Sequence, residues 1–302
     1  MRLASIDIGT NTLLLLVAEI VDNNITKIIC DEHKIARLGE GLDKTGYISE
    51  NAIQRATNIL AEYNRIINNN NVSDVIISAT SAMRDAKNGI DVKSKLESVI
   101  KHPILIIEGL EEAKISFLGS IERNDTKNDL VLDIGGGSTE VTLGNKSEII
   151  KSSSMQIGAV RLTERYFSNQ SDKSNNYKLA KEDIDQQLSK LGKLEFDGDM
   201  IAVAGTPTTI AAIDLGLPQY NAHLIHNHVV NKERLEEIVE IFKQNTKDEL
   251  IEKYNVHPNR ADVILGGAVI LLEFLKYIKR NEFVVSCKGL RYGLLKELIK
   301  NN

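Results

Sequence analysis

The alternation of apolar and polar positions predicts a mixed α/β chain. In its first part, short apolar runs typical of strands alternate with segments whose apolar residues recur at helical spacing. Ser49 is the predicted N-cap of one such segment, whose buried side would include Ile53 and Tyr63. The predicted strands are Leu3–Ile8, Leu13–Val21, Ile25–Leu38, Asp74–Thr80 and Ile104–Ile107, and the predicted helices are Ser49–Ile67, Val92–Ile100 and Glu111–Ile121.

The same pattern begins again at Asp129. A loose polar stretch, Ser168–Asn176, is expected to interrupt it. The predicted strands are Leu130–Ile134, Glu140–Leu143, Ile149–Met155, Ile201–Ala204 and Phe283–Ser286, and the predicted helices are Ala159–Tyr166, Asp183–Leu191, Pro207–Ile213, Lys232–Gln244, Arg260–Ile278 and a final helix.

Two short segments show why the pattern restarts. Ser5–Thr12 (SIDIGTNT) and Val131–Thr139 (VLDIGGGST) each contain a strand that ends in Asp-Ile-Gly, followed by a turn of small residues. They are separated by about one domain length, which indicates a duplicated α/β domain with the two turns facing each other across a cleft. We therefore predict one domain over 1–122, joined by a C-terminal helix over 289–302, and a second over 123–288.

Composition and charge narrow the function. The 302 residues carry a formal net charge of −5, so a general basic field for nucleic acid is absent. Phosphate groups would have to be bound by local groups. The two cysteines, Cys30 and Cys287, do not make a disulfide framework, and a reducing compartment fits better. The N-terminal apolar run is too short for a signal or a membrane span, so we expect a soluble, cytoplasmic protein.

The two turns are candidate phosphate sites. Successive backbone N–H groups in a turn of small residues can hold phosphate oxygens, and side-chain hydroxyls add donors. Asp7 and Asp133 lie at the strand ends, where carboxylates can hold Mg²⁺ against those phosphates. The candidate phosphate-binding residues are Gly9, Thr10, Asn11, Thr12, Gly135, Gly136, Gly137, Ser138 and Thr139.

A third candidate is the start of the helix predicted after Ile201–Ala204. Gly205 follows the strand, Thr206 is a predicted cap and Pro207 would take the first helical position. Such an open helix N-terminus favours an anion or a nucleotide. Ordinary strand-to-helix punctuation would give the same pattern, and without the other two turns it is the preferred interpretation.

Together these segments resemble the exopolyphosphatase and guanosine pentaphosphatase family, in a short two-domain form. The matching segments run in order along nearly the whole chain. They are DIGTNT at Asp7–Thr12, SATSAMRDAKN at Ser78–Asn88, EGLEEA at Glu108–Ala113, DIGGGSTE at Asp133–Glu140, GAVRLTE at Gly158–Glu164, GTPTT at Gly205–Thr209, RADVILGGAVIL at Arg260–Leu271 and VSCKGLRYGLL at Val285–Leu295.

The resemblance implies two ribonuclease-H-like domains of the actin-like ATPase superfamily, with the active site in the cleft between them. It implies that Glu112 activates water, that Arg84 contacts the phosphate tail, and that Glu140 helps Asp7 and Asp133 to arrange Mg²⁺ (or Mn²⁺ in its place) and the water. Polyphosphate or guanosine penta- or tetraphosphate would be the ligand, with no nucleic acid or membrane partner. A homodimer is left open.

These residue types suit phosphoryl transfer, which depends on positioning, a metal to neutralise charge and a group that orients the nucleophile. An arginine offers two parallel hydrogen bonds to phosphate. Like-charged neighbours of Glu112 are expected to bring its pKa toward a useful range. Acidic residues such as Glu111 and Glu112 at a helix start also occur merely to complement the helix dipole.

Several alternatives remain open. One is a slow or non-hydrolytic (p)ppGpp-binding regulator, against which the intact Glu112, Asp7 and Asp133 argue. Another is a small-molecule kinase of the same superfamily, against which the EEA and RDA segments speak. His223, His226 and His228 are spaced like zinc ligands, although a loop without a metal is the preferred interpretation. Lys288 and Arg291 are expected in the cleft. Many family members continue with further helical domains beyond the point where this sequence stops, so we expect short substrates or pppGpp to be preferred, with release between cuts.

Overall fold

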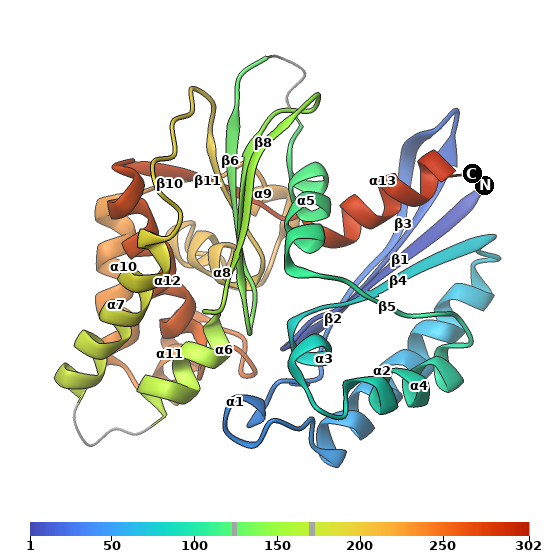
Figure 1. Cartoon of the computed structure of the whole chain (residues 1–302), viewed down its shortest axis with the longest axis horizontal. Coiled ribbons are helices and arrows are strands. Elements are labelled where there is room, and N and C mark those ends of the chain that lie inside the picture. Colours follow the sequence, from blue (N-terminus) through green and yellow to red (C-terminus); the bar gives the residue numbers. More distant parts are fainter. Residues whose placement is uncertain (123–125, 169–172, 302) are drawn as a thin grey trace. The chain divides into compact units, whose positions relative to one another are not determined.

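The computed structural model describes residues 1–122, 126–168 and 173–301, and the chain divides into two compact units. Unit 1 comprises Met1–Gly119 and Gly289–Asn302, and unit 2 comprises Ser120–Lys288. The chain therefore leaves unit 1 once and returns to it for the last helix. Each unit contains a β-sheet of its own (Figure 1).

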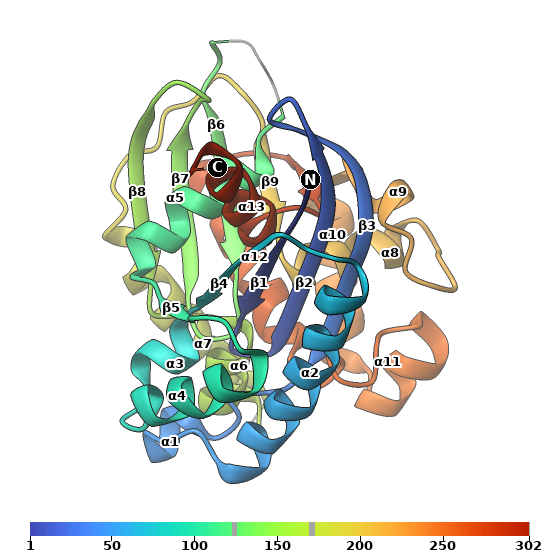
Figure 2. The ribbon, with the colours of Figure 1, turned by 90° about the vertical axis from the view of Figure 1, so that its right-hand side faces the viewer.

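The sheet of unit 1 has five strands in the order β3-β2-β1-β4-β5. β1 pairs antiparallel with β2 and parallel with β4, and β2 pairs antiparallel with β3. Figure 2 shows β1, β2 and β3 side by side. The strands are β1 (Arg2–Ile8), β2 (Thr12–Val21), β3 (Asn24–Ile35), β4 (Asp74–Ala79) and β5 (Leu105–Ile106).

Helices cover both faces of this sheet. Alternate residues of β1 point to opposite faces, so Ala4, Ile6 and Ile8 pack with α2 and α4, whereas Leu3 packs with α13 (Figure 1). Ser49 caps α2 as predicted, because its hydroxyl accepts the Ala52 N–H at 3.3 Å. The helices are α1 (Leu42–Thr45), α2 (Glu50–Asn69), α3 (Ser81–Asp85), α4 (Gly89–Ile100), α5 (Gly109–Ser120) and α13 (Leu290–Asn301).

The sheet of unit 2 has six strands in the order β10-β11-β9-β6-β7-β8. β6 pairs antiparallel with β7 and parallel with β9, and β7 pairs antiparallel with β8. The strands are β6 (Asp129–Ile134), β7 (Thr139–Gly144), β8 (Ile149–Met155), β9 (Met200–Val203), β10 (Val229–Asn231) and β11 (Glu282–Ser286).

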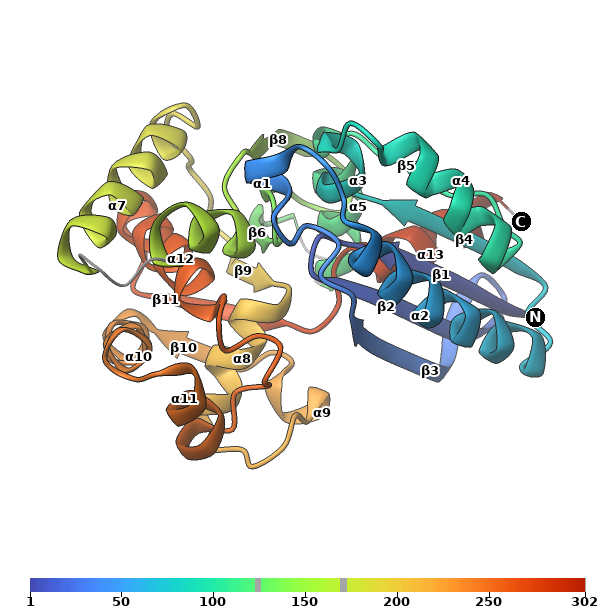
Figure 3. The ribbon, with the colours of Figure 1, turned by 90° about the horizontal axis from the view of Figure 1, so that it is seen from below.

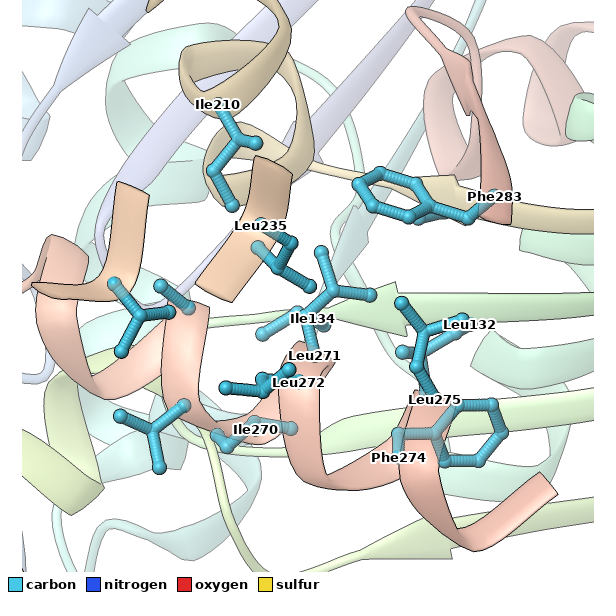
Figure 4. Close-up of a cluster of buried hydrophobic side chains, with 14 of the residues drawn as sticks. Leu132, Ile134, Ile210, Leu235, Ile270, Leu271, Leu272, Phe274, Leu275 and Phe283 are labelled. Carbon is cyan, nitrogen blue, oxygen red and sulfur yellow. The ribbon is translucent and has the colours of Figure 1, made fainter. Parts of the chain in front are cut away.

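One apolar helix, α12, organises the core of unit 2. Its side chains Ile270, Leu271 and Phe274 pack in one cluster with Leu132 of β6 and Phe283 of β11 (Figure 4). Figure 3 shows α12 among the other helices of this unit. They are α6 (Ala159–Leu162), the π-helical turn η1 (Thr163–Phe167), α7 (Lys173–Ser189), α8 (Gly205–Asp214), α9 (Ala222–Ile225), α10 (Lys232–Gln244), α11 (Lys247–Tyr254) and α12 (Ile264–Ile278).

The two sheets share one topology. Strands β1, β2, β3, β4 and β5 correspond in order and direction to β6, β7, β8, β9 and β11, and unit 2 adds β10 at its edge. In both sheets the first strand is central and the second is antiparallel to it. The predicted fold class, two α/β domains of the ribonuclease-H type, is thus confirmed.

Several predicted boundaries in unit 2 were wrong. α8 begins at Gly205, so Thr206 is not its cap, and Pro207 is its third residue. Proline is tolerated there because the first four N–H groups of a helix lack intrahelical acceptors. α12 begins at Ile264 rather than Arg260, and α7 begins at Lys173 rather than Asp183, inside the stretch predicted to be loose.

Short elements were also missed: α1, α3, α9, β10 and α11. α11 carried a readable signal, since Thr246 and Glu249 form a capping box. Residues 169–172 of the predicted polar stretch and the last residue of the predicted C-terminal helix lie outside the described residues. None of the helices in the described ranges is long and apolar enough to span a membrane. Cys30 and Cys287 are both free thiols.

Candidate active site

The candidate base and its arginine meet in unit 1. Arg84 lies in the last turn of α3, just after β4, and Glu112 lies in the first turn of α5, just after β5. Arg84 Nη1 donates to Glu112 Oε2 at 3.1 Å. Two segments that follow neighbouring parallel strands therefore bring together the two residues that the family resemblance singled out.

The guanidinium group of Arg84 is held from two sides. Nη1 also donates to the Ile107 carbonyl oxygen at 2.7 Å, and the Ile107 N–H donates to the Ala79 carbonyl oxygen at 3.1 Å. The second amino group, Nη2, is buried and has no hydrogen-bond partner among the described residues. A buried donor without an acceptor is rare in native proteins, so this group is well placed to receive a ligand oxygen.

Burial separates the two adjacent glutamates of α5. Glu112 is only 7% exposed, whereas Glu111 is exposed to solvent. A glutamate that merely complements the helix dipole has no need of burial. We expected like-charged neighbours around Glu112, but the structure places the cationic guanidinium of Arg84 against it.

The β1–β2 turn of unit 1 directs its carbonyl oxygens into the fold. Gly9 N–H donates to the Thr12 carbonyl oxygen at 3.0 Å and closes the turn. The carbonyl oxygens of Thr10 and Asn11 accept backbone N–H groups of the segment after β3, namely those of Ala36, Arg37 and Gly39. The N–H groups of Thr10 and Asn11 have no acceptor within the described residues, so they remain available to an anion.

The β6–β7 turn of unit 2 has the same arrangement. The carbonyl oxygens of Gly135 and Gly136 accept the first N–H groups of α6, those of Ala159, Val160 and Arg161. Within the described part of the chain, the N–H groups of Gly136, Gly137 and Ser138 find no acceptor. The Thr139 hydroxyl, predicted to bind phosphate, instead donates to the Ile157 carbonyl oxygen at 2.7 Å and is engaged in the fold.

Both turns need glycine at their first position because of close backbone approach. A Cβ atom on Gly9 would lie 3.0 Å from the Thr12 carbonyl oxygen, and one on Gly135 would lie 2.9 Å from that of Ser138. Each turn has four residues between the last paired residues of its strands. The two predicted phosphate-binding turns therefore have the same length and the same close backbone contact at their first residue.

Two candidate acids stand directly opposite each other in unit 2. Asp133 on β6 is the register partner of Glu140 on β7, so both side chains lie on one face of the sheet. Like charges in this position repel unless a cation or a proton is shared. This donor set fits Mg²⁺, which is commonly held by one or two carboxylates together with water and phosphate oxygens.

No larger ligand cluster accompanies this pair. Among the described residues, no group of three His, Cys, Asp or Glu side chains is arranged to hold a metal ion. In unit 1, Asp7 faces Leu14 rather than a second acid. Of the two predicted metal residues, only Asp133 therefore has a second carboxylate as its cross-strand partner.

The third predicted site contains a residue that the sequence interpretation passed over. Thr206 is buried against Gly267 of α12, and the helix start at Gly205 is flanked by Arg260, whose Nη1 donates to the Gly205 carbonyl oxygen at 3.2 Å. Burial lowers the pKa of Arg260 below its usual range. Arg260 falls within a quoted motif, but the motif alone did not indicate its proximity to α8.

Comparisons with known proteins identify the family. A family model described as the Ppx/GppA phosphatase family matches residues 16–302. The chain belongs to this family. It is 33% identical to exopolyphosphatase 2 of Mycobacterium tuberculosis, across 93% of this chain and 92% of that protein. It also resembles the crystal structure of an Aquifex aeolicus Ppx/GppA family member, with a TM-score of 0.83, 31% identity and coverage of 100% and 99% of the two chains.

One relative of this Ppx/GppA chain is longer. A bifunctional 3-dehydroquinate synthase/phosphatase of Fusobacterium nucleatum is 38% identical across 99% of this chain, which spans 46% of that protein. The chain thus covers about half the length of this curated relative. The resemblance inferred from the motifs is confirmed, and the chain is a phosphatase-family member of the exopolyphosphatase type.

The remaining candidates of the Ppx/GppA chain have structural partners. Arg291, expected in a cleft, is buried in unit 1, where its Nε donates to Asp31 at 2.9 Å. His228 contacts Asp214 at 2.7 Å, whereas His226 contacts Glu122 at 3.2 Å, so the two histidines serve different acids. His223 is not part of either contact.

Lys288 also pairs with Glu122, so this carboxylate binds two cationic or hydrogen-bonding side chains within unit 2. Burial alone would raise the pKa of Glu122, but Lys288 and His226 outweigh it and lower the pKa to about 2. Glu122 and Lys288 lie close to the two points where the chain passes between the units. Their pairing gives Lys288 a partner other than phosphate.

Proposed function

We propose that the chain is a Mg²⁺-dependent phosphohydrolase that releases the terminal phosphate of inorganic polyphosphate, of pppGpp, or of both. The observation that carries this proposal is the pairing of Glu112 with Arg84 at 3.1 Å. A candidate base beside a guanidinium with a buried, unengaged amino group supplies two groups that suit hydrolysis of a phosphate chain, one to activate water and one to bind a phosphate oxygen. The names of the curated relatives support the polyphosphate alternative.

In this proposal Glu112 accepts a proton from the attacking water. The water oxygen forms a bond to the terminal phosphorus, the bridging P–O bond breaks, and the bridging oxygen leaves with the shortened chain. Arg84 orients the Glu112 carboxylate with Nη1 and binds a terminal phosphate oxygen with Nη2. Its anchoring to Ile107 limits reorientation, which favours catalysis by positioning.

The two turns would hold the phosphate chain through backbone N–H groups. The backbone hydrogen bonds of the two turns leave five such groups unused among the described residues, those of Thr10, Asn11, Gly136, Gly137 and Ser138. Gly205 and Thr206 would add the start of α8, where Arg260 supplies positive charge. Because these are mostly backbone donors, they bind phosphate of any origin.

Asp133 and Glu140 would hold Mg²⁺, with Asp7 as a further carboxylate, and Mn²⁺ is expected to substitute. When bound, the metal would neutralise charge on the transferring phosphoryl group. Asp133→Ala and Asp7→Ala should each weaken divalent-cation affinity. An unchanged midpoint of Mg²⁺ activation in both variants would contradict this assignment.

The deciding experiment measures phosphate release from polyphosphate of defined lengths and from pppGpp, each with Mg²⁺ and with EDTA. Metal-dependent release of one phosphate per cut is the expected result. Tight binding of pppGpp or ppGpp without any release would favour a regulator. Phosphate transfer from ATP to a small acceptor would favour a kinase and would overturn the proposal.

A further inference from the structure

A side-chain hydrogen bond links the third strand of unit 2 to the candidate site. Ser154 on β8 is the register partner of Glu140 on β7, and its Oγ donates to Glu140 Oε1 at 2.7 Å. Glu140 is in turn the register partner of Asp133 on β6. The three side chains therefore form one row across three strands, on one face of the sheet.

Glu140 lies where a carboxylate needs a hydrogen-bond donor. Its side chain is only 2% exposed and faces another acid, Asp133. Both conditions disfavour a buried carboxylate that has no hydrogen-bond donor. The distance of 2.7 Å is that of a well-formed O–H···O hydrogen bond. A donor of this kind restricts the rotation of the Glu140 carboxylate about its last bond.

The neighbouring cross-strand pair shows what a purely structural hydroxyl pair looks like here. Thr142 on β7 and Ser152 on β8 are register partners on the same face as Glu140 and Ser154, and their hydroxyl oxygens are 3.0 Å apart. Like Glu140 and Ser154, these two residues join β7 to β8 through a serine hydroxyl, but neither of them is a carboxylate. Ser152 is therefore a matched control for Ser154.

We propose that Ser154 is a positioning residue for Glu140. It holds Oε1 so that the carboxylate keeps a fixed orientation beside Asp133, ready for a divalent cation or a cation-bound water. This inference deepens the proposed function and rests on its metal site. Outer-shell groups of this type, when removed, commonly weaken metal affinity or activity by about 10- to 100-fold.

The test compares Ser154→Ala, Ser154→Thr and Ser152→Ala with the wild type. Mn²⁺ affinity is measured without substrate by electron paramagnetic resonance, and Mg²⁺ dependence of kcat, KM for polyphosphate and the unfolding midpoint are measured in parallel. Ser154→Ala should weaken Mn²⁺ binding about tenfold and raise the Mg²⁺ concentration needed for half-maximal kcat, with KM little changed. Ser154→Thr keeps the hydroxyl and should restore both values, and Ser152→Ala should leave both unchanged.

Wild-type Mn²⁺ affinity in Ser154→Ala, equal losses in Ser154→Ala and Ser152→Ala, or a wild type that binds no Mn²⁺ would each overturn the inference. The substrate-free measurement separates it from the proposed function. If no phosphate compound is hydrolysed but the Mn²⁺ pattern holds, the proposed function fails and the positioning role stands. If metal-dependent hydrolysis occurs and Ser154→Ala binds Mn²⁺ normally, the positioning role alone fails.

Discussion

The first three strands of the two units share one backbone plan but carry different chemistry. Asp7 and Asp133 occupy the same position before turns of equal length. The residue opposite Asp7 is Leu14, whereas the residue opposite Asp133 is Glu140. The backbone donors of the turns are therefore duplicated, but the pair of facing acids is found in unit 2 alone among these two hairpins.

The third strands differ in the same way. On β8, Ser154 faces Glu140 and bonds to it. On β3, His33 faces Leu14, and two residues earlier Asp31 binds Arg291 of α13. Polar residues on the third strand thus hold a candidate site residue in unit 2 and the C-terminal helix in unit 1.

In unit 1 the candidate catalytic residues lie outside the hairpin. Glu112 and Arg84 lie on helices that follow β5 and β4, and they bond to each other. The comparison teaches that a duplicated fold can keep the backbone donors of its turns while a few register positions decide where two carboxylates face each other. In the proposed function, the base would lie in unit 1 and the principal metal ligands in unit 2.

The largest effect is expected from removing the base in unit 1. Glu112→Gln keeps the size of the side chain and an oxygen that can accept the bond from Arg84. It loses the ability to accept a proton, so kcat should fall by about 10²- to 10⁴-fold while KM changes little. Steady-state phosphate release from polyphosphate or pppGpp measures both constants.

The adjacent Glu111 provides the control for this variant, because it is exposed on the same turn of α5. Glu111→Gln should retain the wild-type kcat. A nearly normal kcat for Glu112→Gln would show that Glu112 is not the base. The proposed assignment of the base to unit 1 would then be wrong.

A smaller effect is expected from making the two hairpins alike. Glu140→Gln removes one of the facing acids of unit 2 and should weaken Mn²⁺ affinity by at least about tenfold. Leu14→Gln places the same amide at the equivalent position of unit 1 and should leave Mn²⁺ affinity unchanged. Titration calorimetry on the substrate-free protein measures both; equal losses in the two variants would show that the hairpins contribute alike.

Much of this plan could be predicted from the sequence because it is local. The duplicated Asp-Ile-Gly turns lie within continuous segments, and their apolar flanks define β1 and β6 directly. Glu112 and Arg84 were found through the family resemblance. Their contact could not be predicted from spacing, because it depends on how α3 and α5 follow two parallel strands.

Other features depend on register or on weak periodicity. The pairing of Glu140 with Ser154 follows from the register of β7 and β8, which the sequence pattern did not specify. The start of α7 was predicted too late along the chain. Its first turns are mostly polar and show no apolar stripe, so they resemble a loop in the sequence. Arg291 was expected in a cleft, but its partner Asp31 is 260 positions away along the chain.

A moderate effect on stability is expected from the third strand of unit 1. Burial alone would raise the pKa of Asp31, but hydrogen bonds and charge from His33 and Arg291 outweigh it and lower the pKa to about 2. The ionised group therefore stabilises unit 1 above the pKa of the unfolded chain, about 4, and this contribution is lost as the pH falls toward 2.

Asp31→Asn should accordingly lower the free energy of unfolding by about 2 kcal/mol at pH 6, and the difference from the wild type should shrink between pH 4 and 2. Urea unfolding at several pH values measures this. Asp22→Asn, at an exposed turn, should change stability by less than about 0.5 kcal/mol. An Asp31→Asn difference that stayed constant down to pH 2 would exclude the ion pair as its source.

The smallest effect is expected beside Asp7 itself. Ser78 on β4 is the register partner of Asp7, whereas the equivalent neighbour of Asp133 is Val203. Ser78 is 0% exposed, and its hydroxyl has no hydrogen-bond partner among the described residues. A buried hydroxyl in that state gives the fold no stability, so Ser78→Ala should leave the unfolding free energy unchanged or raise it slightly.

If the Ser78 hydroxyl bonds to a water or a phosphate oxygen during the reaction, Ser78→Ala should lower kcat/KM by about two- to tenfold, which corresponds to the loss of one ordinary hydrogen bond. Parallel measurements of urea unfolding and kcat/KM decide between the two roles. Lost stability with full activity would show that the Ser78 hydroxyl stabilises unit 1 and takes no part in the reaction. Of the two register partners of Asp7, neither Ser78 nor Leu14 would then contribute to catalysis.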